Sequence, residues 1–180
     1  MKRVERQTRE TTIRVGVALG NGPARIDVEN EFLRHMLDTF ARYAGLELEL
    51  HARGDLHHHT VEDVAITLGL ALKDLTPARA TRYGWAAVPM DDAWVDAALD
   101  LGGRAWYGGT LPSRLYQHFL RSLAFAMDAT LHVQVVRGFD RHHIVEAAIK
   151  ATGLSLRQAI AEGDQLFSTK GAVEIRRTED

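Results

Sequence analysis

Apolar residues recur along the chain with two different periods. Two segments, beginning at Phe32 and at Leu115, place apolar residues three and four positions apart, as Phe32, Met36 and Phe40 do. That spacing predicts helices with one buried face. Residues 46–50 and 131–135 instead alternate strictly between apolar and polar side chains, which predicts half-buried strands. The pattern therefore predicts an α+β protein.

The order of these elements repeats within the chain. Each predicted helix leads into an alternating strand, then a glycine, and then a second helix that begins with paired histidines. His35 precedes His58 by 23 residues, and His118 precedes His142 by 24 residues. Because a repeat of the same elements at nearly the same spacing indicates a duplicated unit, we predict an internal duplication.

The remaining strand patterns complete the two halves. Residues 11–17 and 24–28 alternate on either side of Gly20-Asn21-Gly22, and we expect them to pair as a hairpin. Residues 85–90 and 94–101 should open the second half in the same way.

We divide the chain into a first half-domain, residues 1–84, and a second half-domain, residues 85–180, within one compact unit. Each half-domain is expected to hold a small mixed sheet and two helices, with the helices packed inward. Each also carries one copy of the paired-histidine motif.

Composition and charge exclude several classes of protein. The chain has 180 residues, no cysteine and a net charge of -2, so disulfides, thiolate metal sites and a broad basic surface for nucleic acid are not expected. Residues 1–6 are too charged to open a signal peptide, and no apolar run approaches the roughly 20 residues of a membrane helix. We expect a soluble, cytoplasmic protein with no nucleic-acid or membrane partner.

The histidines indicate a metal site. His58 and Glu62 are four positions apart on a predicted helix, as are His142 and Glu146, so each pair shares one helix face. Together the repeated motifs offer enough ligands for two metal ions with positions left open for a substrate. The candidate ligands are His35, His58, His59, Glu62, His118, His142, His143 and Glu146. Spacing alone does not identify the metal, nor which ligand serves which ion.

At these residues the chain resembles the imidazoleglycerol-phosphate dehydratase family over nearly its whole length. The segments that carry the resemblance are Arg9–Ile13, Phe32–Leu37, Gly54–Leu56, His58–Asp63, Arg82–Gly84, Val88–Asp91, Asp100–Arg104, His142–Ala147 and Ser168–Gly171.

The resemblance implies a duplicated α+β fold of the ribosomal protein S5 domain 2-like kind. It also implies two Mn²⁺ ions per active site and a homo-oligomer of 24 subunits built from trimers, with active sites at subunit contacts. The implied reaction, a step of histidine biosynthesis, converts D-erythro-imidazoleglycerol phosphate to imidazole acetol phosphate and water.

The resemblance also assigns roles to individual residues. Arg82, Arg104, Ser168 and Lys170 would bind the substrate phosphate, and Glu10 would contact the glycerol hydroxyls. Since the proton to be removed lies on a carbon without an adjacent carbonyl, we expect the imidazole ring to react as a metal-bound imidazolate that expels the neighbouring hydroxyl. Glu62 or Glu146 would then take the proton from the next carbon.

Some positions depart from the family pattern. The segment before the first histidine pair is shortened to His57 alone, and Arg34, Thr39 and Tyr43 replace the usual residues of the first long helix. Two alternatives therefore stay open. One is a diverged paralog that binds or stores metal, and the other is a dinuclear metalloenzyme acting on another phosphorylated small molecule.

Overall fold

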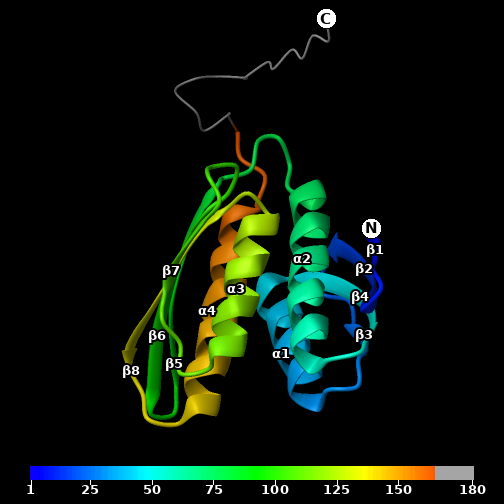
Figure 1. Cartoon of the computed structure of the whole chain (residues 1–180). Coiled ribbons are helices and arrows are strands. Elements are labelled where there is room, and N and C mark those ends of the chain that lie inside the picture. Colours follow the sequence, from blue (N-terminus) through cyan, green and yellow to red (C-terminus); the bar gives the residue numbers. More distant parts are fainter. Residues whose placement is uncertain (165–180) are drawn as a thin grey trace, which may run out of the picture.

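The computed structural model describes residues 1–164 and consists of two sheets with four helices between them (Figure 1). The first half contains β1 (Lys2–Gln7), β2 (Thr11–Leu19), β3 (Arg25–Asp27), α1 (Glu31–Ala44), β4 (Leu46–Gly54) and α2 (His57–Leu75). The second half contains β5 (Tyr83–Met90), β6 (Ala93–Asp100), β7 (Trp106–Gly109), α3 (Arg114–Ala126), β8 (Thr130–Arg137) and α4 (Arg141–Ala159). The expectation of inward-packed helices is confirmed.

The two halves have the same topology. The strand orders are β1-β2-β4-β3 and β5-β6-β8-β7, and in each sheet the third strand of the half runs parallel to the fourth. The predicted α+β class, the mixed sheets and the internal duplication are therefore confirmed. Ser168 and Lys170 lie outside the described residues.

One predicted pairing is wrong. Residues 11–17 and 24–28 do not form a hairpin, because β2 pairs with β1 on one side and with β4 on the other. β3 joins the sheet only through a parallel ladder with β4. The hairpin in each half is formed by its first two strands, so β5 and β6 correspond to β1 and β2. Polarity alternation found the strands, but it contains no information about which edges meet.

Local sequence signals set the ends of α1. The Asn30 side chain accepts a hydrogen bond from the Leu33 N–H at its first turn, and Gly45 ends it with a left-handed conformation, φ 67°. The second helix of each half is different, since α2 and α4 are buried over several faces between a sheet and another helix. Their histidines project from the first turn, where the helices leave the core.

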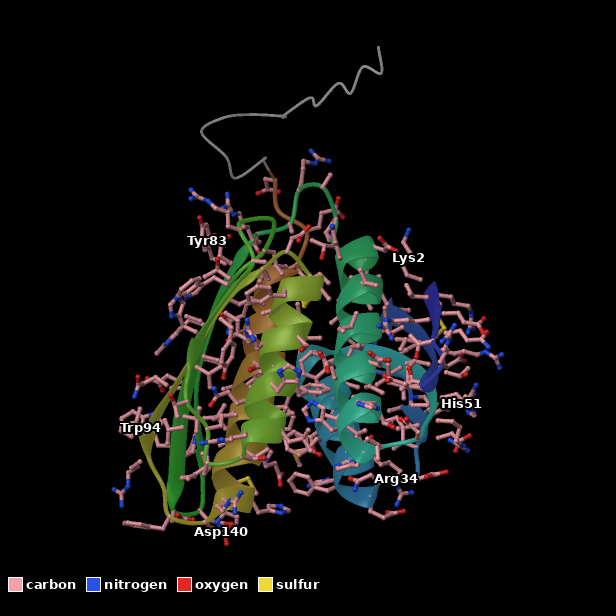
Figure 2. All side chains as sticks on the ribbon, viewed as in Figure 1. Lys2, Arg34, His51, Tyr83, Trp94 and Asp140 are labelled. Atoms are coloured by element: carbon pink, nitrogen blue, oxygen red, sulfur yellow. The ribbon has the colours of Figure 1, made fainter. Side chains whose placement is uncertain are left out.

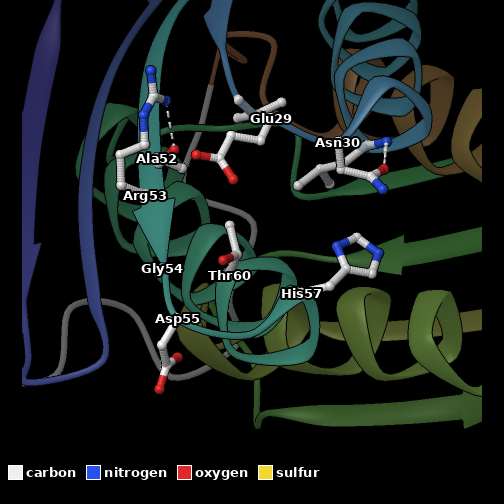
Figure 3. Close-up of a pocket in the computed structure, with 10 residues that line it drawn as sticks. Glu29, Asn30, Ala52, Arg53, Gly54, Asp55, His57 and Thr60 are labelled. Atoms are coloured by element: carbon white, nitrogen blue, oxygen red, sulfur yellow. Dashed lines mark hydrogen bonds between the residues drawn. The ribbon is translucent and has the colours of Figure 1, made fainter.

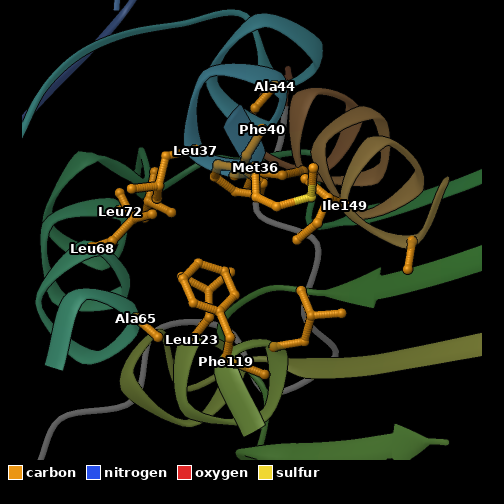
Figure 4. Packing of buried hydrophobic residues seen from close by; sticks show 14 of the residues in the cluster. Met36, Leu37, Phe40, Ala44, Ala65, Leu68, Leu72, Phe119, Leu123 and Ile149 are labelled. Atoms are coloured by element: carbon orange, nitrogen blue, oxygen red, sulfur yellow. The ribbon is translucent and has the colours of Figure 1, made fainter. Parts of the chain in front are cut away.

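The core lies where the helices cross (Figure 4). α2 packs on α3, and α1 packs on α4, so each crossing joins one half to the other. Phe40 and Phe119 are fully buried in this layer. Because the crossings hold the first turns of α2 and α4 near α3 and α1, side chains from different halves meet there. None of the helices in residues 1–164 is long and apolar enough to span a membrane.

Candidate metal centre

Two groups of metal-ligating side chains lie at the helix crossings. We call the first the Glu146 group: His35 from α1 with His142 and Glu146 from α4. The Nε2 atoms of His35 and His142 lie 3.1 Å and 3.0 Å from the same carboxylate oxygen, Glu146 Oε2. The two imidazole rings are stacked, with centroids 5.9 Å apart. The side chain of Glu146 is only 8% exposed, whereas both histidines reach the surface.

The second set, the Glu62 group, contains His58 and Glu62 from α2 and His118 from α3. His118 Nε2 lies 3.1 Å from Glu62 Oε1, and His58 Nε2 lies 3.7 Å from Glu62 Oε2. The rings of His58 and His118 are stacked with centroids 5.3 Å apart. Each half of the chain therefore contributes one histidine to the His-x-x-x-Glu pair of the other half. His35 of the first half joins the Glu146 group, and His118 of the second half joins the Glu62 group.

The donor sets fit a divalent first-row metal ion. In each group the two ring nitrogens and one carboxylate oxygen lie within 4.8 Å of one another, close enough to converge on one ion. Two imidazoles and one carboxylate suit zinc, manganese, iron and related ions, and three protein ligands leave positions for other ligands. The predicted ligands His35, His58, Glu62, His118, His142 and Glu146 are thus brought together in two sets of three.

His59 and His143 do not join either group. Asp55 Oδ1 lies 2.8 Å from His59 Nδ1, and Asp92 Oδ1 lies 2.6 Å from His143 Nδ1. These hydrogen bonds raise the pKa of both imidazoles and lower the pKa of both carboxyls. A carboxylate on Nδ1 fixes the ring orientation and leaves Nε2 as the atom that can bind a metal.

Sequence reasoning missed these two aspartates. Asp55 precedes His59 by four residues, which is a usable local signal. Asp92 is 51 residues from His143 and lies in the turn between β5 and β6, so no local pattern connects them. Glu10 lies beside the first pair, with its Oε2 3.6 Å from His59 Nδ1. Next to it, Thr11 donates a hydrogen bond to the buried Asp63, which also pairs with Arg6.

Comparison with known proteins places this geometry in a family. Residues 29–156 match the family model described as imidazoleglycerol-phosphate dehydratase. A relative of that name from Pyrobaculum calidifontis is 45% identical over 94% of this chain and 98% of its own length, and one from Pyrobaculum arsenaticum is 46% identical over 93% and 98%.

The chain belongs to this family. The solved structures agree. The Pyrococcus furiosus enzyme has a TM-score of 0.87 and 37% identity, covering 94% of this chain and all of that one. The Staphylococcus aureus enzyme has a TM-score of 0.80 and 27% identity, covering 91% of this chain and all of that one.

The imidazoleglycerol-phosphate dehydratase family acts on a phosphorylated substrate, and cationic side chains are needed to bind its phosphate group. Arg82 precedes β5 and pairs with Asp100 at the end of β6, its Nε lying 2.5 Å from Asp100 Oδ1. The turn at Asp92, against which His143 rests, is at the other end of the same eight-residue strands. At roughly 3.3 Å per residue, Arg82 is about 25 Å from that histidine within one chain.

Figure 2 shows this separation, with Tyr83 at one end of the second sheet and Asp140, which caps α4, at the other. Arg104 is exposed in the loop after β6, at the same end as Arg82. In a single chain Arg82 and Arg104 therefore do not meet the metal-ligating groups.

His57 and Tyr43, two positions that depart from the family pattern, belong to neither metal-ligating group. His57 is the first residue of α2 and borders a cavity of about 250 Å³ with Glu29, Asn30 and Asp55 (Figure 3). The cavity lining includes no member of the Glu146 or Glu62 group. Tyr43 lies on α1, where its ring centroid is 5.5 Å from Lys150 Nζ.

Proposed function

We propose that this chain dehydrates D-erythro-imidazoleglycerol phosphate to imidazole acetol phosphate, as an enzyme of histidine biosynthesis. The observation that carries the proposal is the pair of His₂Glu groups, each assembled from both halves of the chain. Family membership supplies the reaction, and the two groups supply the residues that a metal-dependent lyase needs.

The proposed metal is manganese, with two ions per active site. When bound, such ions would act as Lewis acids that lower the pKa of the substrate imidazole. His35, His142 and Glu146 would hold one ion, and His58, Glu62 and His118 would hold the other. Their imidazoles bind metal only when neutral, so metal affinity is expected to fall as the solution is made more acidic.

Three carboxylates are proposed as acid–base and binding groups. The carboxylates of Glu62 and Glu146 are the candidates for taking the proton from the substrate carbon. They lie among the histidine side chains that would hold the metal ions, and therefore close to the bound substrate. Glu10 is proposed to contact the glycerol hydroxyls, because its carboxylate lies beside His59 at the start of the same helix. Replacing Glu146 by Gln should abolish turnover.

We also propose that active sites form between copies of the chain, in a 24-mer built from trimers. Along the eight-residue strands, Arg82 is about 25 Å from His143 of its own chain, and Arg104 lies at the Arg82 end. They can therefore reach a metal-bound substrate only from a second copy. His59 and His143, which face away from both groups, would complete the coordination of ions held by another copy. Ser168 and Lys170 are proposed to assist Arg82 and Arg104 at the phosphate.

The outer face of the second sheet supports association. It carries exposed aromatic side chains, which are Tyr83, Trp85, Trp94 and Trp106. The outer face of the first sheet is instead crossed by ion pairs between Arg3, Arg14 or Arg25 and glutamates. Clustered exposed aromatic residues are typical of surfaces that bind another protein.

A cytoplasmic location is also proposed, because the proposed substrate is a phosphate ester, which does not cross membranes unaided.

The direct test is turnover of imidazoleglycerol phosphate by metal-stripped protein, with and without added Mn²⁺, following formation of the ketone product. The proposal expects turnover that depends on Mn²⁺. A folded, assembled and metal-loaded protein that forms no ketone product would show that the scaffold serves another substrate.

Mixing variants tests the shared site. Arg82→Ala and Glu146→Gln should each be inactive alone, since each removes a different part of every site. If the parts come from different copies, unfolding and reassembling an equal mixture should restore about a quarter of the sites. A mixture that stays inactive, although mixed assemblies form, would mean that both residues act within one chain.

A further inference from the structure

The two metal-ligating groups differ in one charged neighbour. Lys150 follows Glu146 by four residues on α4, and its Nζ lies 2.9 Å from Glu146 Oε1. The equivalent position in the other half, four residues after Glu62 on α2, is Ile66. Within residues 1–164, the only ion-pair partners of Glu62 are His58 and His118. The duplication therefore conserved the ligands but not the charge around them.

The Lys150–Glu146 contact is enclosed. The side chains are 16% and 8% exposed, and the Lys150 Nζ also contacts Met90 Sδ at 3.4 Å and lies over the Tyr43 ring. The Glu146 carboxylate is thus already paired with a cation that is held in place.

This pairing changes what the Glu146 group offers to a metal ion. Before any ion binds, the Lys150 ammonium already contacts the Glu146 carboxylate, whereas within residues 1–164 no lysine or arginine pairs with Glu62. A divalent cation entering the Glu146 group also meets a positive charge held on the same carboxylate. Even at a water-like dielectric constant, a single and a double charge about 5 Å apart repel enough to lower affinity about tenfold.

Lys150 also limits the geometry of coordination. It occupies Oε1 of Glu146, so only Oε2, the oxygen that both histidines already face, is free for a metal ion. Glu62 directs Oε1 toward His118 and Oε2 toward His58, with neither oxygen held by a lysine. Glu146 can thus bind through one oxygen only, while Glu62 can use both.

We propose that the two metal sites fill in order, the Glu62 group first and the Glu146 group second, and that Lys150 sets this order. The inference rests on the proposed metal-dependent function but concerns affinity rather than turnover. Its consequence is one firmly held ion and one ion that exchanges more readily.

The test is a Mn²⁺ titration of the metal-stripped full-length protein, with free Mn²⁺ measured from its electron paramagnetic resonance signal. Wild-type protein should bind in two steps whose dissociation constants differ about tenfold or more. Glu62→Gln should remove the tighter step, and Glu146→Gln should remove the weaker one. Lys150→Met should tighten the weaker step about tenfold and bring the two steps together.

The duplicated fold provides matched controls. Ile66→Met, at the equivalent position of the other half, should leave both steps unchanged. Ile66→Lys should weaken the tighter step, because it recreates beside Glu62 the charge that Lys150 places beside Glu146. Circular dichroism of every variant separates a change in affinity from a loss of folding.

Several outcomes would overturn the ordering. They are a single shared affinity in wild-type protein, a tighter step that is lost in Glu146→Gln, and a weaker step that Lys150→Met leaves unchanged or weakens. Two equal steps would leave the proposed metal-dependent function standing. A folded wild-type protein that binds no Mn²⁺ would overturn that function together with the order of filling.

Discussion

At the scale of single residues, paired carboxylates and imidazoles dominate the site. The repeated histidine motif has two different positions. The first histidine contacts the glutamate one helical turn later. The second contacts an aspartate that lies outside the motif. Asp55 and Asp92 play the same part in the two halves although they reach their histidines from different elements, the start of α2 and the β5–β6 turn. The duplication has preserved a contact, not a sequence position.

The Asp92–His143 pair gives a prediction on pKa. The hydrogen bond that His143 donates to the Asp92 carboxylate raises the pKa of His143 above its ordinary value of 6.5, so Asp92→Asn should lower that pKa toward 6.5. The expected change is measured by NMR titration of the imidazole signals in metal-stripped protein. His59, which is held by Asp55 instead, is the internal control and should keep its raised pKa.

The same pair has a defined effect on stability. Because the folded state raises the pKa of His143, the contribution of the protonated imidazole is fully present below pH 6.5 and is lost as pH rises through the raised pKa. In metal-stripped protein, Asp92→Asn should therefore destabilise at pH 5.5 more than at pH 8.5. Equal destabilisation at both values would contradict the ion-pair account.

At the scale of elements, the site depends on how closely the helices cross. Gly69 on α2 and Gly153 on α4 occupy equivalent positions, each where a helix of the other half approaches. A Cβ at Gly69 would lie 2.7 Å from the Ala126 Cβ and 2.8 Å from the Leu123 carbonyl oxygen. These glycines permit the close crossings that bring His118 to Glu62 and His35 to Glu146.

Gly69→Ala should therefore be destabilising. In an exposed helix the same change stabilises by about 0.5–1 kcal/mol, but here the methyl group would overpack the crossing and cost about 1–3 kcal/mol. Gly153→Ala should cost less, because its nearest contacts would be 3.0 Å and 3.1 Å. The check is the free energy of unfolding from urea denaturation of both variants. A Gly69→Ala variant more stable than wild type would contradict this description of the crossing.

At the scale of the whole molecule, the two halves are alike inside and different outside. Both sheets bury one face against the helices, yet only the second sheet exposes several large aromatic residues. His143 and the two predicted phosphate-binding arginines, Arg82 and Arg104, lie at opposite ends of that second half. The exposed aromatic face and the separation of the arginines from the histidines are both explained if the active enzyme contains several copies of the chain.

Trp85→Glu should weaken assembly, because Trp85 is 60% exposed on the aromatic face and a buried charge at an interface is costly. The particle mass, from analytical ultracentrifugation, is expected to fall in this variant. Leu19→Glu places the same charge at a 52% exposed residue of the first sheet and should leave the mass unchanged. An unaltered mass in Trp85→Glu would remove this face from the proposed interface.

The repeated elements, the α+β class, the duplication and the candidate ligands could all be predicted from the sequence alone. Helical and strand periods are local properties, and two copies of His-His-x-x-Glu in register are visible without a fold. Motif density over most of the chain also identified the family before any geometry was available.

Which side chains meet depends on the tertiary fold. The exchange of His35 and His118 between halves, the contact of Asp92 with His143 and the pairing of β2 with β4 join residues distant in the chain. Helix crossings and sheet order set these distances, and periodicity within one element carries no information about either. The same reason explains why the sequence did not single out Lys150, whose contact with Glu146 has no counterpart at Glu62.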